Sequence, residues 1–396
     1  MSPLSLLFVA LFNSILGLSV LFPILGPLGR QLGLTELQIG ALTTAYALAQ
    51  FAGSPFWGKR SEVVGRKPVL LRGILGFALT FAAFGVIARL GQLGVLRGNG
   101  LFAALLVSRL MGGLYSSATL PTVQAYVADV TERDHRTSGM ALIGAAFGLA
   151  VVFGPAIGAL LAPFGLLVPV FVSASIALLN ALFVAWKLPE PVRHERSPVA
   201  PELLPVASKV WVLLGVGFVA TVAAVSMEQT VAFYFQDRLA LNETQAARNV
   251  GFSLVAYGVV AVLVQGVFVR RAKWPPLRLL RLGLPIAAFG LFTFVLARGL
   301  PLLLLAMVLQ GLGQAMTSPG VTAALSLGVQ DEEQGAVAGL NSASQALGRT
   351  LGPVLGTALY EIRPEYPYLF GCALLVVMSL LLFGGHIQRS RAAAPR

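Results

Sequence analysis

The stretch GLAVVFGPAIG, residues 148–158, decides the architecture of this chain. It lies inside a run of 50 residues, 137–186, that contains no Asp, Glu, Lys or Arg. A similar Gly-Pro segment, GPVLG, recurs at residues 352–356. Gly154 and Gly352 are 198 residues apart, which is half of the 396 residues in the chain. One apolar Gly-Pro helix, placed twice at half-chain spacing, predicts a chain built from two repeats.

The composition indicates that the folded chain has lipid as its solvent. Charged residues make up 11% of the chain, apolar residues make up 57%, and the mean hydropathy is +0.82. A soluble chain carries about 25% charged residues. Backbone polar groups need partners inside lipid, so we expect the membrane spans to be α-helices. The single cysteine, Cys372, excludes an internal disulfide and a thiolate metal site.

Charge-free runs occur from end to end and predict twelve transmembrane helices, since about 20 residues cross the hydrocarbon core of a bilayer. The first apolar run is too long for a signal peptide, so we interpret it as the first span. The predicted helices are 4–26, 37–58, 68–89, 100–128, 138–162, 165–187, 209–236, 248–269, 276–297, 300–328, 335–360 and 366–387.

Basic residues predict the orientation of these helices. With both termini in the cytoplasm, cytoplasmic segments hold 19 of the 28 Lys and Arg residues, and outer segments hold seven. This asymmetry follows the positive-inside rule. Topology therefore explains the net charge of +12, and we expect no nucleic-acid partner. We expect an integral protein of a bacterial cytoplasmic (inner) membrane with both termini in the cytoplasm.

A proline-rich segment, 189–208, is the longest polar connector and is predicted to be a cytoplasmic linker. It separates an N-terminal six-helix bundle, 1–188, from a C-terminal six-helix bundle, 209–396. Pro155 and Pro353 match at the offset of 198 residues. Two parallel repeats joined in this way are typical of transporters whose substrate site lies between the halves, near the middle of the membrane.

The segment GKRSEVVGRKP, residues 58–68, connects the second and third predicted helices. It resembles the signature loop of the major facilitator superfamily, G-x-L-a-D-R-x-G-R-[RK]. The resemblance implies a gating loop in which Glu62 caps a neighbouring helix end and Arg66 pairs with Asp129, the acid that ends the fourth helix. A basic loop that only orients the chain is the alternative. The expected gating residues are Gly58, Glu62, Gly65, Arg66 and Lys67.

Arg109 lies deep in the fourth predicted helix, four residues before Gly113. A charged side chain at this depth is costly unless it faces a cavity or a partner. The pair resembles the R-x-x-x-G motif of proton-coupled members of the superfamily, which implies a role for Arg109 in proton transfer. An Arg bound to backbone carbonyl groups of neighbouring helices is the structural alternative.

The opening stretch resembles the fifth-helix motif of the superfamily's antiporters, G-x-G-x-x-x-G-P-x-x-G-G. Gly148, Gly154, Pro155 and Gly158 match this motif. Small residues at four-residue spacing allow close helix contact in lipid, and a proline frees a carbonyl group and kinks the helix. The resemblance implies export by antiport, as in tetracycline and multidrug exporters, with this helix sealing one side of the cavity. Generic packing of small residues is the alternative.

Glu228 is the only carboxylate well inside a predicted span. A medium of low dielectric constant disfavours the charged form of a carboxyl group, so we expect Glu228 to bind and release protons. We assign proton coupling to Glu228, Arg109 and Asp129. A Glu near the outer interface, or one paired structurally with an Arg, is the alternative.

Arg349 lies well inside the eleventh predicted helix. Three roles are open for it: neutralising Glu228, binding an anionic substrate, or stabilising the helices. Polar residues within spans are, taken singly, more often contacts between helices than ligand contacts. The predicted substrate cavity comprises Asn13, Gln50, Gln229, Phe233, Tyr234, Gln310, Gln345 and Arg349.

These observations predict an all-α membrane protein of the major facilitator fold, with twelve transmembrane helices in two pseudo-symmetric halves. We expect it to export a small amphipathic compound or drug by proton antiport with alternating access. Export of a sugar or an amino-acid-like metabolite is an alternative, and a non-transporting membrane sensor or channel is another. We expect no enzymatic activity, cofactor or metal. The expected partners are a small-molecule substrate, protons and membrane lipid, with the chain as a monomer.

Overall fold

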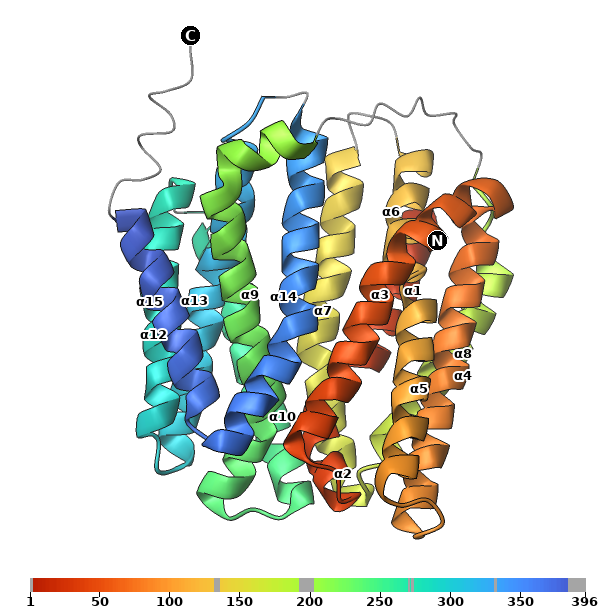
Figure 1. The fold of residues 1–396 in the computed structure, drawn as a ribbon. Coiled ribbons are helices and arrows are strands. Elements are labelled where there is room, and N and C mark those ends of the chain that lie inside the picture. Colours follow the sequence, from red (N-terminus) through yellow and green to blue (C-terminus); the bar gives the residue numbers. More distant parts are fainter. Residues whose placement is uncertain are drawn as a thin grey trace. The chain divides into compact units, whose positions relative to one another are not determined.

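The computed structural model describes residues 3–131, 136–191, 203–269, 271, 274–330 and 333–383. Within these ranges all regular structure is helical (Figure 1). Most of the predicted linker, 189–208, and the predicted helix end at 384–387 lie outside the described residues. The chain divides into two compact units. Unit 1 comprises Met1–Arg196 and Leu241–Val255, and unit 2 comprises Ser197–Ala240 and Ala256–Arg396.

The elements of unit 1 are α1 (Pro3–Ser19), α2 (Leu25–Gln31), α3 (Glu36–Val64), α4 (Arg66–Gln92), α5 (Gly98–Ser116), α6 (Thr119–Val130), α7 (Arg136–Leu161), the short 3₁₀-helix η2 (Ala162–Phe164) and α8 (Val168–Lys187). Helix α10 (Glu243–Leu263) begins in unit 1 and ends in unit 2. The other elements of unit 2 are α9 (Leu203–Leu239), the π-helix η3 (Val264–Val269), α12 (Pro276–Leu296), α13 (Leu300–Ser326), α14 (Gln334–Ile362) and α15 (Tyr366–Phe383).

The helices have the length and composition of membrane spans. Within the described residues, nine helices are long and apolar enough to cross a membrane. The remaining three predicted spans are also helical: α1 is apolar but shorter, and α3 and α14 hold more polar and small residues. The all-α membrane fold is therefore present, and the count of twelve spans stays a prediction.

Two predicted helices are broken, and each break lies four residues before a proline. The helix predicted over 4–26 ends at Ser19, four residues before Pro23, and α2 begins after a turn. The helix predicted over 100–128 is interrupted at Ser117, four residues before Pro121. A proline ring collides with the carbonyl group four residues earlier and removes one N–H donor. The prediction of unbroken helices is wrong at these two places.

The connection predicted as a loop after the second span is almost entirely helical. Helix α3 continues to Val64 and α4 begins at Arg66. Only Gly65 lies between them, with a φ of 121°, which glycine adopts at little steric cost. The chain therefore turns at one residue, and side chains at the end of α3 lie beside those at the start of α4.

A serine joins the first helix of each unit to the Gly-Pro helix of the same unit. In unit 1, Ser19 Oγ of α1 donates a hydrogen bond to the carbonyl group of Ala150 in α7 at 2.8 Å. In unit 2, Ser226 Oγ of α9 donates to the carbonyl group of Gly352 in α14 at 2.9 Å. We call these contacts the unit 1 seam and the unit 2 seam. Helices α9 and α14 lie side by side in Figure 1. In both units a serine of the first helix therefore bonds to the Gly-Pro helix, but the acceptor in unit 2 lies one turn further along, because Ala150 corresponds to Gly348 at the offset of 198 residues.

Unit 1 includes a segment that lies outside the predicted N-terminal bundle, 1–188. This segment is Leu241–Val255, which contains the first half of α10. Its Gly251 packs directly on α7, because a Cβ atom there would lie 2.4 Å from Cβ of Ala159 and 2.8 Å from the carbonyl oxygen of Pro155. The missing side chain lets the backbone of α10 approach the predicted antiporter motif.

Candidate functional site

Arg66 is the centre of a polar network at the junction of α3, α4 and α6. Its Nε donates to Oδ2 of Asp129 at 2.9 Å, and its Nη1 donates to Oγ of Ser61 at 2.6 Å. Ser61 in turn donates to the carbonyl group of Gly58 at 2.7 Å. The side chains of Arg66 and Asp129 are only 7% and 1% exposed. The ion pair implied by the resemblance is therefore present, and it is buried.

A second acid, Glu190, belongs to this network and was missed in the sequence. Its carboxylate accepts hydrogen bonds from the backbone N–H groups of Arg66 at 2.6 Å and Lys67 at 2.9 Å. The first N–H groups of a helix have no partner within the helix and favour negative charge. Glu190 thus caps α4, while Glu62 is exposed near the end of α3. The available signal was an acid between two prolines directly after α8.

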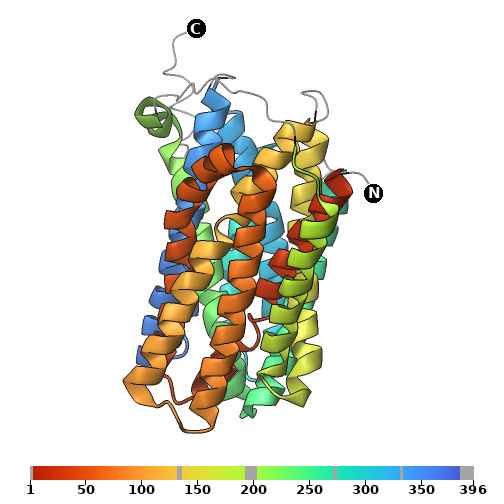
Figure 2. The same ribbon diagram turned by 90° about the vertical axis from the view of Figure 1, so that its right-hand side faces the viewer.

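Arg109 lies in the middle of α5 and is 4% exposed. Its guanidinium carbon lies 4.4 Å from the ring centre of Tyr46 on α3 and 5.8 Å from that of Phe84 on α4. Gly113 lets α3 come close, because a Cβ atom there would lie 2.2 Å from the carbonyl oxygen of Tyr46. Helices α4 and α5, in orange, lie side by side in Figure 2. Two aromatic rings therefore form the surroundings of the Arg109 charge.

The rings compensate only part of this charge. A desolvated cation–π contact contributes about 2 kcal/mol, whereas an Arg at the centre of a membrane helix costs about 3 kcal/mol or more. Among the described residues, Arg109 makes no hydrogen bond or ion pair, and its Nε is buried without a partner. The structural alternative was that backbone carbonyl groups bind Arg109. No such hydrogen bond is found among the described residues.

The glycines of the predicted antiporter motif on α7 differ in their packing. A Cβ atom on Gly154 would lie 2.0 Å from Oγ of Ser19, and one on Gly158 would lie 2.6 Å from the carbonyl oxygen of Val20. A Cβ atom on Gly148 would have no atom of another described helix within 4 Å. Close helix contact is therefore confined to the second half of the motif.

Glu228, Arg349 and Tyr257 of α10 lie within electrostatic range of one another in unit 2. Glu228 follows Ser226 of the unit 2 seam by two residues, and Arg349 precedes Gly352 by three. The charge of Arg349 acts on Glu228, and both charges act on the Tyr257 hydroxyl group. Glu228 is half-buried, Arg349 is exposed and Tyr257 is buried. We call these three residues the acid–base cluster.

Unit 1 has no equivalent of the acid–base cluster. Leu21, two residues after Ser19, occupies the position that Glu228 occupies two residues after Ser226. Val151 lies 198 residues before Arg349 and takes its place in unit 1. The sequence indicated the acid and the cation but gave no reason to add Tyr257. The only signal was that Tyr257 is the single tyrosine of α10.

Phe233 and Tyr234, two predicted cavity residues, are fully buried in unit 2. The Tyr234 hydroxyl group donates to the carbonyl group of Phe294 at 2.9 Å, and its ring centre lies 4.6 Å from that of Tyr368. The structure therefore places both residues in an aromatic core and not on an open surface of the unit.

Two predicted cavity glutamines connect neighbouring helices. Gln310 is buried and donates to the carbonyl group of Ala287 at 2.6 Å, which joins α13 to α12. Gln50 donates to Oγ of Ser116 at 3.3 Å, which joins α3 to α5. Hydrogen bonds of this kind stabilise helix contacts in lipid. The other predicted polar cavity residues are half-buried: Asn13, Gln229 and Gln345.

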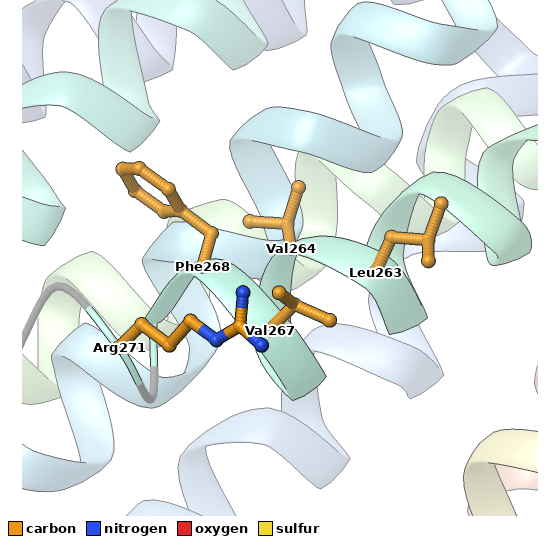
Figure 3. A pocket seen from close by; sticks show the side chains of 5 residues that line it. All are labelled: Leu263, Val264, Val267, Phe268 and Arg271. Atoms are coloured by element: carbon orange, nitrogen blue, oxygen red, sulfur yellow. The ribbon is translucent and has the colours of Figure 1, made fainter.

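The surface of unit 2 carries a groove. Its volume is about 610 Å³, and it is lined by Leu263, Val264, Val267, Phe268 and Arg271 (Figure 3). Figure 3 shows the side chain of Arg271 turned back toward Val267. The lining contains none of the predicted substrate or proton residues.

Comparison with known sequences gives matches over nearly the whole chain. The family model of the Major Facilitator Superfamily matches residues 7–300 and 250–395. Multidrug resistance protein 2 of Bacillus subtilis is 28% identical over 378 residues, which cover 93% of this chain and 91% of that protein. The quinolone resistance protein NorA of Staphylococcus aureus is 23% identical over 368 residues, which cover 91% of this chain and 90% of NorA.

A solved structure has the same fold. The human organic anion transporter MFSD10 (TETRAN) matches with a TM-score of 0.66 and 22% identity, over 96% of this chain and 98% of that chain. Identity at this level supports the fold alone. The apolar helices make the chain an integral membrane protein, and the family match makes it a member of a transporter family with small-molecule substrates. The chain belongs to the Major Facilitator Superfamily.

Proposed function

We propose that the protein is a secondary active transporter that exports a small amphipathic compound or drug in exchange for protons. The observation that carries this proposal is the acid–base cluster beside the unit 2 seam. It combines an embedded acid, which can carry a proton, with a contact between two helices. The names of the two bacterial relatives, multidrug resistance protein and quinolone resistance protein, support a drug as the substrate.

Protonation of Glu228 changes the electrostatics of the acid–base cluster. The carboxylate form attracts Arg349, and the protonated form leaves the guanidinium group without a counter-charge. An unpaired charge in a medium of low dielectric constant favours any state in which it reaches water or a polar partner. Arg349 is three residues from Gly352, so its movement bears on the contact between α9 and α14. Proton binding thereby favours one of two alternating conformations.

The gate in our proposal is the network around Arg66. Asp129 and Glu190 hold the side chain and the backbone N–H group of this residue, so they fix the start of α4 relative to α6 and α8. Asp129 and Arg109 connect the protonation state of Glu228 to this gate. A closed gate keeps the network intact, and an open gate requires the buried ion pair to separate.

The membrane and the orientation are part of the same proposal. The excess of Lys and Arg in the segments assigned to the cytoplasm, 19 against seven, supports a bacterial cytoplasmic (inner) membrane with both termini inside. In that orientation an inward proton gradient drives export. We propose that the chain works as a monomer in contact with membrane lipid.

Transport in proteoliposomes tests the proposal, with norfloxacin, a zwitterionic quinolone that carries a carboxylate, as the amphipathic probe. An imposed pH gradient is expected to drive norfloxacin against the flow of protons in the wild type. Glu228→Gln is expected to abolish the gradient-driven part, because the amide cannot exchange a proton. Glu243→Gln, the same change in the first turn of α10, is the matched control and should keep it. Gradient-driven movement in Glu228→Gln at the wild-type rate would contradict the proposal.

A further inference from the structure

One positive charge inside the described membrane spans has no counter-charge among the described residues of its own unit. Three charged side chains lie well inside described spans: Arg109, Glu228 and Arg349. Glu228 and Arg349 are of opposite sign and act on each other. Arg109 makes no ion pair or hydrogen bond with any residue in the described part of the chain. A charge in this position is stabilised by a bound counter-charge.

We propose that Arg109 binds an anionic group, a carboxylate or a sulfonate, carried by the amphipathic substrate. This inference rests on the proposed transport function and specifies the charge of the group that is recognised. A cationic group would be repelled by Arg109, and a neutral group would leave the buried charge uncompensated. A charge-assisted contact to an oxyanion is the strongest hydrogen bond that a guanidinium group makes.

A further donor lies on the helix that faces Arg109. The Tyr46 hydroxyl group is buried, and Ser116 lies near it. The Tyr46 ring lies against the Arg109 guanidinium group. A guanidinium group and a phenol beside it are donors that suit the oxygens of an anion.

The surroundings of Arg109 also suit an amphipathic molecule. The rings of Tyr46 and Phe84 are the described neighbours of the guanidinium group, at 4.4 and 5.8 Å. They provide apolar contact directly beside the charge. An inorganic anion would use the charge alone, whereas an aromatic or aliphatic acid would use both the charge and the rings. We therefore assign the site to the acid group of an amphipathic compound.

Binding to matched ligands tests the charge without any proton gradient. The melting temperature of the full-length protein in nanodiscs is measured with 1-naphthoate and with 1-naphthylmethylammonium. A further sample has its chloride replaced by gluconate. We expect naphthoate to raise the melting temperature and to bind at least about tenfold more tightly than the ammonium compound. Equal binding of the two compounds would overturn the proposal. Stabilisation by chloride with no competition from naphthoate would show an inorganic-anion site and would also overturn it.

Variants test whether Arg109 is the residue that binds naphthoate. Arg109→Met is expected to weaken naphthoate binding at least about tenfold, while Arg89→Met, the same change at an exposed position on α4, keeps it. Without ligand, Arg109→Met is expected to melt no lower than the wild type, since an uncompensated charge is removed. A lower melting temperature together with unchanged naphthoate affinity would assign Arg109 to the structure alone.

A second variant keeps the proposal testable if Arg109→Met does not fold. Tyr46→Phe retains the ring and removes one donor, so naphthoate affinity is expected to fall several-fold. Unchanged affinity in Tyr46→Phe, with equal binding of naphthoate and the ammonium compound to the wild type, would overturn the anion site. If norfloxacin export is proton-driven and naphthoate does not bind, the transport proposal stands and this inference fails.

Discussion

Arg66 illustrates how much of the proposed gate depends on single residues. Its side chain is bound by Asp129 and Ser61, and its backbone N–H group is bound by Glu190. The sequence predicted the first of these contacts through the signature loop. It could not predict Glu190, because the residue lies 124 positions away and only the folded chain brings it to the start of α4.

Asp129→Asn is expected to destabilise the protein strongly. The change leaves the buried Arg66 charge without its partner, which costs about 3 kcal/mol or more when one member of a buried pair is removed. The melting temperature in nanodiscs should fall clearly below that of the wild type, with Glu243→Gln as a control at a half-buried acid. A melting temperature of Asp129→Asn equal to that of the wild type would show that the ion pair does not stabilise the junction of α3, α4 and α6.

Glu190→Gln is expected to have a smaller effect than Asp129→Asn. The amide oxygen still accepts a hydrogen bond from the start of α4, and only the favourable charge at the helix N-terminus is lost. This interaction contributes about 0.3–1 kcal/mol. The same melting assay, run at low and high salt, should show a small deficit that shrinks as salt screens the charge. A loss as large as that of Asp129→Asn would mean that Glu190 has a larger role than capping.

At the scale of helices, the two seams determine where small residues are required. Gly154→Ala places a methyl group against Ser19, where the contact would be 2.0 Å, whereas Gly148→Ala places it in open space. Overpacking costs about 1–3 kcal/mol, so only Gly154→Ala should lower the melting temperature and the rate of norfloxacin export. Similar losses of melting temperature and export rate in both variants would show that the unit 1 seam is not the part of the motif that requires glycine.

The helices themselves were largely predictable, because runs of apolar residues of span length are specific for membrane helices. The breaks within these helices were not predictable, since a proline interrupts some helices and is accommodated in others. Pro23 and Pro121 follow breaks in α1–α2 and α5–α6, whereas Pro155 and Pro353 lie inside continuous helices. The presence of a proline alone does not decide which helices continue, and tertiary packing does.

At the scale of the whole molecule, the two units share one design and differ in charge. The repeat and the asymmetry at Arg349 were visible in the sequence, because both depend on spacing and residue type. The association of Glu228, Arg349 and Tyr257 was not visible, since it depends on which faces of α9, α14 and α10 turn toward each other. Single polar residues in apolar helices, such as Ser19 and Gln310, carry the same pattern whether they bind a substrate or a neighbouring helix.

Proton movement in response to substrate tests the central claim most directly. Proteoliposomes with a pH-sensitive dye inside and no imposed gradient receive norfloxacin on one side, and the internal pH is followed. We expect protons to move opposite to norfloxacin in the wild type and in Glu243→Gln, and no proton movement in Glu228→Gln. Norfloxacin transport without proton movement in the wild type, or wild-type proton movement in Glu228→Gln, would contradict proton antiport.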